Sequence, residues 1–233
     1  MEEIEDFVDE RQKGWCIHCG TSMATAKTNW DHVPTESLLD RPIPAHTPKV
    51  RVCLPCNREF SKDEEYFRVF LSCVLSGSTE PTAQSDPRIQ RALARSPALR
   101  TRIDAQKCEF TTIGGEKRAF WTPEQDRIKR IILKNARGHA YYEMGEPMLH
   151  APDQVWMMPL ASLTAEEVMI FEEASSPGWA EVGSRMLTRQ AADPANSWVV
   201  VQNNVYRYAV TQTGGLTVRT VIRDYLATEV TWD

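Results

Sequence analysis

Hydrophobic residues recur at helical spacing in the first third of the chain, directly after a segment without such a period. Between residues 66 and 75 the apolar positions follow steps of one, three and four, which predicts an amphipathic helix. Ser61 and Glu64 have the spacing of a capping box and Gly77 is a suitable stop, so we expect this helix to begin at about Ser61. Residues 2–13 predict a shorter helix ahead of it.

The middle of the chain predicts two further helical regions and a hairpin. Residues 88–102 have a helical pattern that Pro97 interrupts. Residues 108–121 form two short β-prone runs on either side of a Gly-Gly pair, which is typical of a β-hairpin. Capping residues at Thr122 then start a long helix that we expect to end near Gly145.

The last third of the chain predicts a helix start at residues 163–168 and then mainly strands. Three β-prone segments are separated by turn residues at Asn203-Asn204 and Gly214-Gly215; they read WVVVQ, VYRYAVT and LTVRTVI. This order predicts an antiparallel meander at the C-terminus.

A segment of linker composition, SGSTEPTAQSDP, lies at residues 76–87. We therefore expect an α+β protein with an N-terminal domain at 1–76, a linker at 77–87 and a mixed α+β domain at 88–233.

Composition and charge are those of a globular protein, with 42% hydrophobic residues in 233. No apolar run approaches the roughly 20 residues that span a bilayer. The acidic start MEEIEDFVDE does not resemble a secretory signal, so we expect a cytoplasmic protein. The net charge is −5, and six of the 32 acidic residues lie in the first ten positions. Any contact with DNA must therefore come from local basic patches.

Four of the six cysteines lie in two Cys-x-x-Cys pairs, Cys16 with Cys19 and Cys53 with Cys56. In a reducing compartment this spacing is typical of metal binding, because two thiolates in one tight turn can both reach a tetrahedral zinc ion. Four thiolates leave no open coordination position, so we expect a structural zinc that organises the segment between the pairs. Cys73 lies in an apolar helical segment and is expected in the core.

Three polar residues accompany these pairs: Asp31 and His32 lie between them, and Asn57 follows the second. Phosphodiester cleavage needs an activated water and stabilisation of the charge on the phosphate and the leaving oxygen. A neutral imidazole can take the proton from water near pH 7, and oxygen donors suit Mg²⁺ or Mn²⁺. We interpret His32 as a candidate general base, and Asp31 and Asn57 as candidate ligands of a catalytic divalent ion.

The motifs around these residues resemble the HNH endonuclease family over about residues 12–76. The segments that carry the resemblance are CIHCG at 16–20, WDHVP at 30–34 and VCLPCNREFSKDEEYF at 52–67. The resemblance implies a ββα-metal fold in a treble-clef zinc site. By position it implies His32 as the general base, Asp31 as the metal-binding carboxylate before it, and Asn57 as a second metal ligand at a helix start.

One motif position departs from the family pattern. The family's middle asparagine lies several residues before the second cysteine pair and fixes the loop that carries the histidine. Here that stretch reads Ala45-His46-Thr47-Pro48-Lys49 and contains no asparagine. Thr47 and His46 are the candidates for its role.

Two sets of basic residues are candidates for binding nucleic acid, since guanidinium groups pair with phosphate oxygens. The first set is Arg88, Arg91 and Arg95, and the second is Arg127, Arg130, Lys134 and Arg137 on the long helix. The absence of acids between positions 127 and 142 favours a DNA-binding stripe. The alternative is an ordinary charged solvent face of an amphipathic helix.

Three hypotheses for function follow. The first is a metal-dependent endonuclease that hydrolyses DNA, with structural Zn²⁺ and catalytic Mg²⁺ or Mn²⁺, and phage defence or restriction is one setting for it. The second is a catalytically inactive zinc-binding module that binds nucleic acid or protein. The third is a defence effector whose nuclease is switched on through the C-terminal domain. A homodimer or a regulatory partner is consistent with the first and third.

Overall fold

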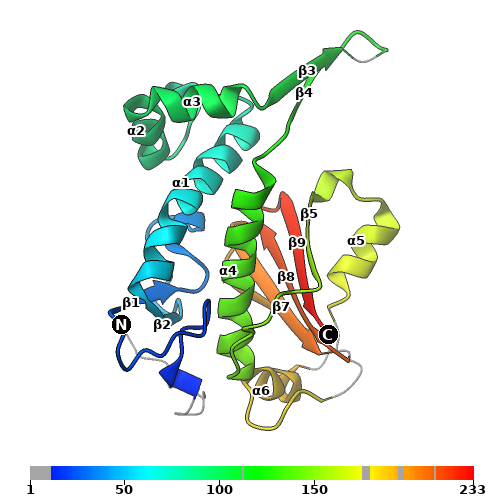
Figure 1. Ribbon diagram of the computed structural model, residues 1–233. Coiled ribbons are helices and arrows are strands. Elements are labelled where there is room, and N and C mark those ends of the chain that lie inside the picture. The colour runs from blue at the N-terminus through cyan, green and yellow to red at the C-terminus, as the bar shows by residue number, and fades with distance from the viewer. Residues whose placement is uncertain (1–11, 112, 175–178, 194–196, 213) are drawn as a thin grey trace. The chain divides into compact units, whose positions relative to one another are not determined.

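Six α-helices and nine β-strands occur in the part of the chain that the structure, a computed structural model, describes (Figure 1). The helices are α1 (Leu54–Ser76), α2 (Pro87–Arg95), α3 (Pro97–Asp104), α4 (Gln125–Met144), α5 (Ala165–Glu172) and α6 (Arg185–Ala192). The strands are β1 (Thr28–His32), β2 (Lys49–Cys53), β3 (Lys107–Thr111), β4 (Lys117–Trp121), β5 (Gln154–Pro159), β6 (Trp198–Gln202), β7 (Tyr206–Gln212), β8 (Leu216–Ile222) and β9 (Leu226–Trp232). Short 3-10 helices lie at Gln12–Gly14, Glu36–Leu38, Pro81–Ala83 and Leu160–Ser162. The expected α+β class is confirmed.

The described residues are 12–111, 113–174, 179–193, 197–212 and 214–233. The helix expected at residues 2–13 lies almost entirely outside them. Among the described residues, no helix is both long enough and apolar enough to cross a bilayer.

These residues form two compact units, one of 12–59 with 132–233 and one of 60–131. The chain passes from one unit to the other within α1 and within α4. These bounds do not coincide with the expected boundary at 77–87, and the assignment of separate functions to 1–76 and 88–233 stays a prediction.

The unit of residues 60–131 contains the segment expected as a linker, and that segment is held by hydrogen bonds. The buried Gln84 side chain accepts a bond from Ser72 at 2.7 Å and donates to the carbonyl of Ser78 at 2.7 Å. The expected interruption before Pro97 is confirmed, because the Ser96 side chain caps α3 by accepting from the backbone of Leu99. The expected hairpin is confirmed as β3 and β4.

Helix α1 begins at Leu54, seven residues before the expected start at Ser61. The helix follows β2 directly, and the Leu54 N–H donates to the carbonyl of Lys27 at 2.8 Å. Ser61 and Glu64 therefore lie inside the helix, and the capping-box interpretation was wrong. The first turn carries Cys56, so the helix begins within the cysteine-bearing segment, ahead of the apolar period at residues 66–75.

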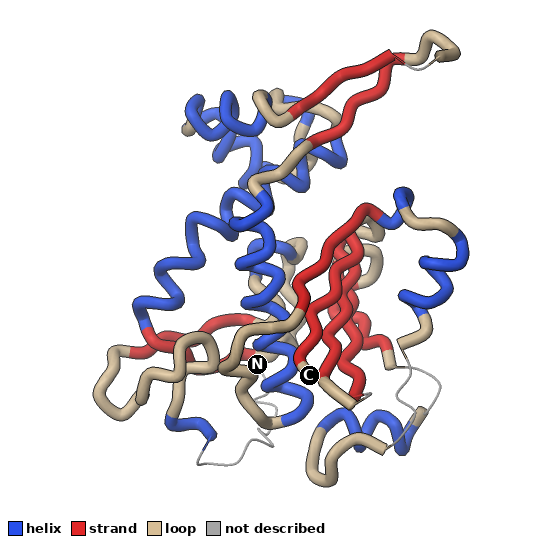
Figure 2. Tube along the Cα trace, turned by 45° about the vertical axis from the view of Figure 1, so that its right-hand side comes forward, coloured by secondary structure: helices blue, strands red, loops and turns tan. Residues whose placement is uncertain are grey.

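The C-terminal sheet has five antiparallel strands in the order β5-β9-β8-β7-β6. Its strands lie side by side in Figure 2, where strands are red. The three expected strands are confirmed as β6, β7 and β8. Asn204 has a positive φ of 58°, as its turn between β6 and β7 requires. The sequence interpretation missed β9 and its edge partner β5, which joins the sheet from before α5.

Helices cover both faces of this sheet within the larger unit. On one face the His139 ring of α4 stacks on Tyr208, with ring centroids 3.8 Å apart, and its Nε2 lies 2.9 Å from the Tyr206 hydroxyl. Burial lowers the pKa of His139 to about 3, so this imidazole is neutral. On the other face Phe171 of α5 packs against Val221 and Ala227.

The second half of α4 also contacts the segment that carries the two cysteine pairs. Tyr141 belongs to a buried apolar cluster that includes Ile17, Val33 and Val52. A Cβ at Gly138 would lie 2.8 Å from Cγ2 of Val33, so glycine is required for this close approach. Residues 132–144 therefore lie between the cysteine-bearing segment and the sheet (Figure 1).

Gly138→Ala tests this packing. We expect a loss of unfolding free energy of about 1–2 kcal/mol, because overpacking costs about 1–3 kcal/mol while alanine returns up to about 1 kcal/mol of helix propensity. Urea denaturation measures the change. Adding Val33→Ala should relieve the overlap, and Gly14→Ala, where a Cβ meets no atom within 4 Å, is the control. A single variant as stable as wild type would contradict the close approach.

Candidate functional site

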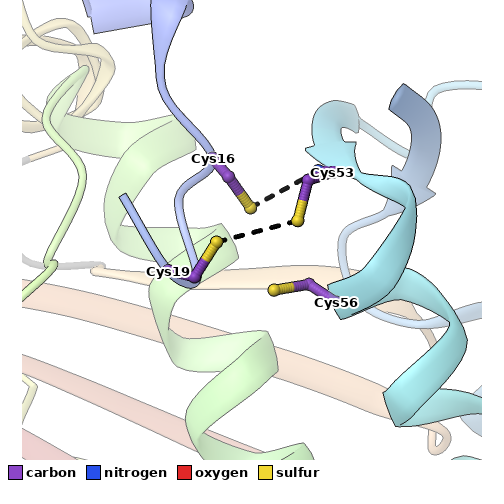
Figure 3. A group of neighbouring side chains, drawn as sticks. All are labelled: Cys16, Cys19, Cys53 and Cys56. Atoms are coloured by element: carbon purple, nitrogen blue, oxygen red, sulfur yellow. Dashed lines mark hydrogen bonds between the residues drawn. The ribbon is translucent and has the colours of Figure 1, made fainter. Parts of the chain in front are cut away.

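The sulfur atoms of the four paired cysteines all lie within 4.8 Å of one another. Figure 3 shows them directed into one space between the turn at residues 16–20 and the start of α1. The Sγ atoms of Cys19 and Cys53 are 3.7 Å apart, close to the separation of about 3.8 Å that a tetrahedral zinc with Zn–S bonds of about 2.3 Å produces. The expected clustering is confirmed, and the four thiols fit a structural metal such as zinc.

A tight backbone turn brings the first pair together. The Gly20 N–H donates to the carbonyl of Cys16 at 2.8 Å, and the Cys16 N–H donates to the carbonyl of Thr21 at 2.9 Å. Gly20 has a φ of +68°, which glycine adopts without strain. The backbone N–H of Cys53 lies 3.4 Å from Cys16 Sγ and links the two pairs.

The cysteines differ in how easily they ionise. Burial raises the pKa of the Cys19 thiol, but hydrogen bonds with Thr21 outweigh burial and bring it down to about 7. Burial and the neighbouring thiols raise the pKa of Cys56. A bound cation would therefore be needed to ionise all four.

An open groove of about 720 Å³ lies beside the cluster and gives solvent access to it.

Asp31 lies at the inner side of β1 and is 7% exposed. Its Oδ1 is 2.8 Å from the Nζ of Lys134, which is also buried, and its Oδ2 is 3.7 Å from Nε2 of His18. Burial alone would raise the pKa of Asp31, but the His18 contact and the Lys134 charge outweigh it, so the pKa lies below the usual value. Asp31 is therefore an ionised carboxylate inside the protein with a protein cation as its partner.

His32 follows Asp31 and has different partners. Its ring is half-buried, and Nε2 lies 3.0 Å from Oε1 of Glu36. The other carboxylate oxygen of Glu36 accepts from Arg41 at 2.9 Å. Burial lowers the pKa of His32 although Glu36 opposes this, so the imidazole is neutral near pH 7.

Asn57 lies in the first turn of α1 and is half-buried. The two residues considered for the middle asparagine's place do not contact His32 in the interactions described. Thr47 instead bonds through its hydroxyl to the carbonyl of Pro44 at 2.9 Å, and His46 is exposed. The sequence analysis did not identify Glu36 as a partner of His32. The two residues are four positions apart, a spacing that indicates a side-chain contact in an α-helix, but they do not lie in an α-helix.

The basic residues of the unit at 60–131 are partly engaged by acids. Arg88 is paired with Asp86 at 2.8 Å, whereas Arg91 and Arg95 are exposed on α2. Both arginines at the start of α4 contact Asp63, Arg127 at 2.6 Å and Arg130 at 3.3 Å.

Of the basic residues of α4 in the other unit, Lys134 is buried and Arg137 is half-buried. Lys134 is 3% exposed and paired with Asp31. Arg137 donates to the carbonyls of His18 at 2.8 Å and His150 at 3.1 Å. The absence of acids between positions 127 and 142, which favoured a DNA-binding stripe, thus has a structural counterpart. Asp63 of α1 pairs with Arg127 and Arg130, and Asp31 of β1 pairs with Lys134. The prediction that Lys134 lies on an exposed basic surface was wrong, because its side chain is buried.

The loop between β1 and β2 is held by residues far along the chain. The buried backbone N–H of Thr35 donates to Oδ1 of Asn135 at 3.0 Å. Asp40 forms a double contact with Arg223 at 2.6 and 2.8 Å, and its N–H donates to Gln202 at 2.9 Å. The C-terminal residues therefore fix the loop that follows His32.

Zinc analysis tests the cysteine cluster. We expect about one zinc per chain by elemental analysis, and loss of the metal and of folded structure in Cys16→Ser, because zinc binding contributes to folding in such sites. Cys108→Ser, at an exposed cysteine outside the cluster, should keep the zinc. Folded wild-type protein without zinc would contradict the assignment.

A double-mutant cycle tests the buried ion pair. Lys134→Met should lower the unfolding free energy by about 3–5 kcal/mol, because it leaves a buried carboxylate without its cation. Asp31→Asn combined with Lys134→Met removes both charges and should recover much of this loss. Lys129→Met, at a half-buried lysine of the same helix, is the control. Equal stability of the single and double variants in urea would show that the pair is not formed.

The chain was also compared with known proteins, and none matches it. No protein-family model, no curated protein and no solved structure was found to be similar.

Proposed function

We propose that this chain is a metal-dependent endonuclease of the HNH type that hydrolyses DNA phosphodiester bonds. The proposal takes His32 as the general base, the four cysteines as a structural zinc site, and Asp31 and Asn57 as ligands of a catalytic Mg²⁺ or Mn²⁺ ion. DNA is the proposed substrate, with the exposed Arg91 and Arg95 as candidates for phosphate contact.

One arrangement supports this function above all: a neutral, half-buried histidine ends a strand whose hairpin partner runs directly into the cysteine-bearing helix. In the β1–β2 pair, Asp31 lies opposite Val50 and His32 lies opposite Lys49. Helix α1 starts at the residue after β2 and carries Cys56 and Asn57. Strand, strand and helix thus follow in the order that the resemblance to HNH endonucleases implies.

The chemistry asked of His32 is proton transfer. Its Nε2 lies against Glu36, so Nδ1 is the nitrogen that can accept a proton from water. The water oxygen then attacks phosphorus, the bond from phosphorus to the 3′-oxygen breaks, and the departing oxygen takes a proton from solvent. A neutral imidazole is the form this step needs, and burial keeps His32 in that form.

The proposed metal ligands fit the ion only in part. A divalent ion would stabilise charge on the phosphate and on the leaving oxygen. In the conformation described, however, Asp31 is bound to Lys134 and offers that ion no unengaged Oδ1. Metal binding through Oδ1 of Asp31 would therefore compete with its contact to Lys134.

The ion pair favours a second candidate, a zinc-stabilised binding module without catalytic activity. A lysine that neutralises the acidic residue removes the negative charge that attracts a divalent cation. In this alternative, Asp31 and Lys134 stabilise the fold and His32 is a surface histidine.

Plasmid cleavage separates the two candidates. Wild-type protein with Mg²⁺ or Mn²⁺ should nick or cut supercoiled plasmid. His32→Ala should reduce the rate by about 10²–10⁴-fold, the usual contribution of a general base. His46→Ala, at an exposed histidine in the following loop, is the matched control and should retain activity.

Equal cleavage by wild type and His32→Ala would contradict the role of His32. Unchanged cleavage by Asp31→Ala would contradict the metal site. No cleavage by zinc-loaded wild type would favour the binding module.

A further inference from the structure

We propose that Glu36 is the positioning residue of this site: its carboxylate, itself held by Arg41, fixes the His32 ring through Nε2 and leaves Nδ1 directed to the water. The inference rests on the proposed function of His32 and deepens it.

The contacts form a chain of three side chains. His32 Nε2 lies 3.0 Å from Glu36 Oε1, and Arg41 Nη2 lies 2.9 Å from Glu36 Oε2. A carboxylate accepts hydrogen bonds and does not donate them when ionised, so the proton of a neutral ring is on Nε2 and the lone pair is on Nδ1. This is the arrangement that a general base needs, because a third group sets its tautomer and its orientation.

Glu36 is itself on a well-anchored segment. It starts the short 3-10 helix Glu36–Leu38, which Leu38 and Leu39 anchor with 2% and 0% exposure. The preceding Thr35 is buried, and its N–H is bound to Asn135 of α4. A residue that is already held by packing and by backbone hydrogen bonds can orient its neighbour without a further loss of its own conformational entropy at each turnover.

We expect Glu36 to contribute little to stability. The Glu36 and Arg41 side chains are 36% and 60% exposed, and ion pairs at such positions typically contribute about 0–1 kcal/mol. Substitutions at Glu36 should therefore leave the protein folded, and a loss of rate in them would reflect orientation and not unfolding.

Single-turnover cleavage of plasmid tests the kinetic role. Glu36→Ala should lower kcat by about 10- to 100-fold, a share of the contribution expected for the base itself, with KM for DNA and the Tm unchanged. Glu36→Gln keeps an acceptor oxygen without the charge and should restore part of the rate. Glu146→Gln, at an exposed glutamate, is the control for loss of one negative charge and should behave as wild type.

Long-range ¹H–¹⁵N NMR of the imidazole nitrogens tests the contact without any need for activity. The His32 signals, identified by their absence in His32→Ala, should report the Nε2–H form in wild type, and Glu36→Ala should shift them and raise the share of the Nδ1–H form. Unchanged His32 signals, or an unchanged kcat in Glu36→Ala when His32→Ala is inactive, would overturn the role of Glu36. Shifted signals in a protein that cleaves no DNA would support the contact and contradict the nuclease function.

Discussion

A charged carboxylate inside a protein needs a cation beside it, and the pair of Asp31 with Lys134 governs how the cysteine-bearing segment contacts the rest of its unit. Around this pair, Asn135 binds the backbone of Thr35 and Gly138 allows close contact with Val33. One face of the second half of α4 thus contacts β1 and the loop after it. The opposite face packs on the sheet, so a single helix connects the two.

Local patterns in the sequence were sufficient for several elements. The spacing of the cysteines predicted their cluster, and the turn residues predicted the β3–β4 hairpin and strands β6 to β8. Helix α4 ends beside Gly145, as its pattern indicated. These features depend on residues that are near one another in the chain. The start of α1 was missed because the helix begins ahead of its apolar period, in the segment that carries Cys56. Strand β5 was missed because β9, its partner among the described strands, lies more than sixty residues later.

The site was less predictable than the fold, for a physical reason. Ion-pair partners in a folded chain are brought together by tertiary structure, so Asp63 and Asp31, which pair with Arg127, Arg130 and Lys134, could not be found from the sequence of α4. Lys134 and Asp31 are 103 positions apart, and Glu36 contacts His32 across an irregular loop. The roles proposed for His32, Asp31 and Asn57 stay predictions, and the partner that the structure gives Asp31, Lys134, is set by tertiary structure.

The anchoring of Asp31 and Thr35 by α4 has a consequence for dissecting this protein into parts. A fragment limited to residues 12–76 would contain the cysteines, Asp31 and His32 but neither Lys134 nor Asn135. Its aspartate would have lost its internal cation, and its loop would have lost a hydrogen bond to a buried amide. Such a fragment is chemically a different molecule at this position, with an acidic group open to any ion in the buffer. Its metal affinity would describe the fragment and not the intact chain.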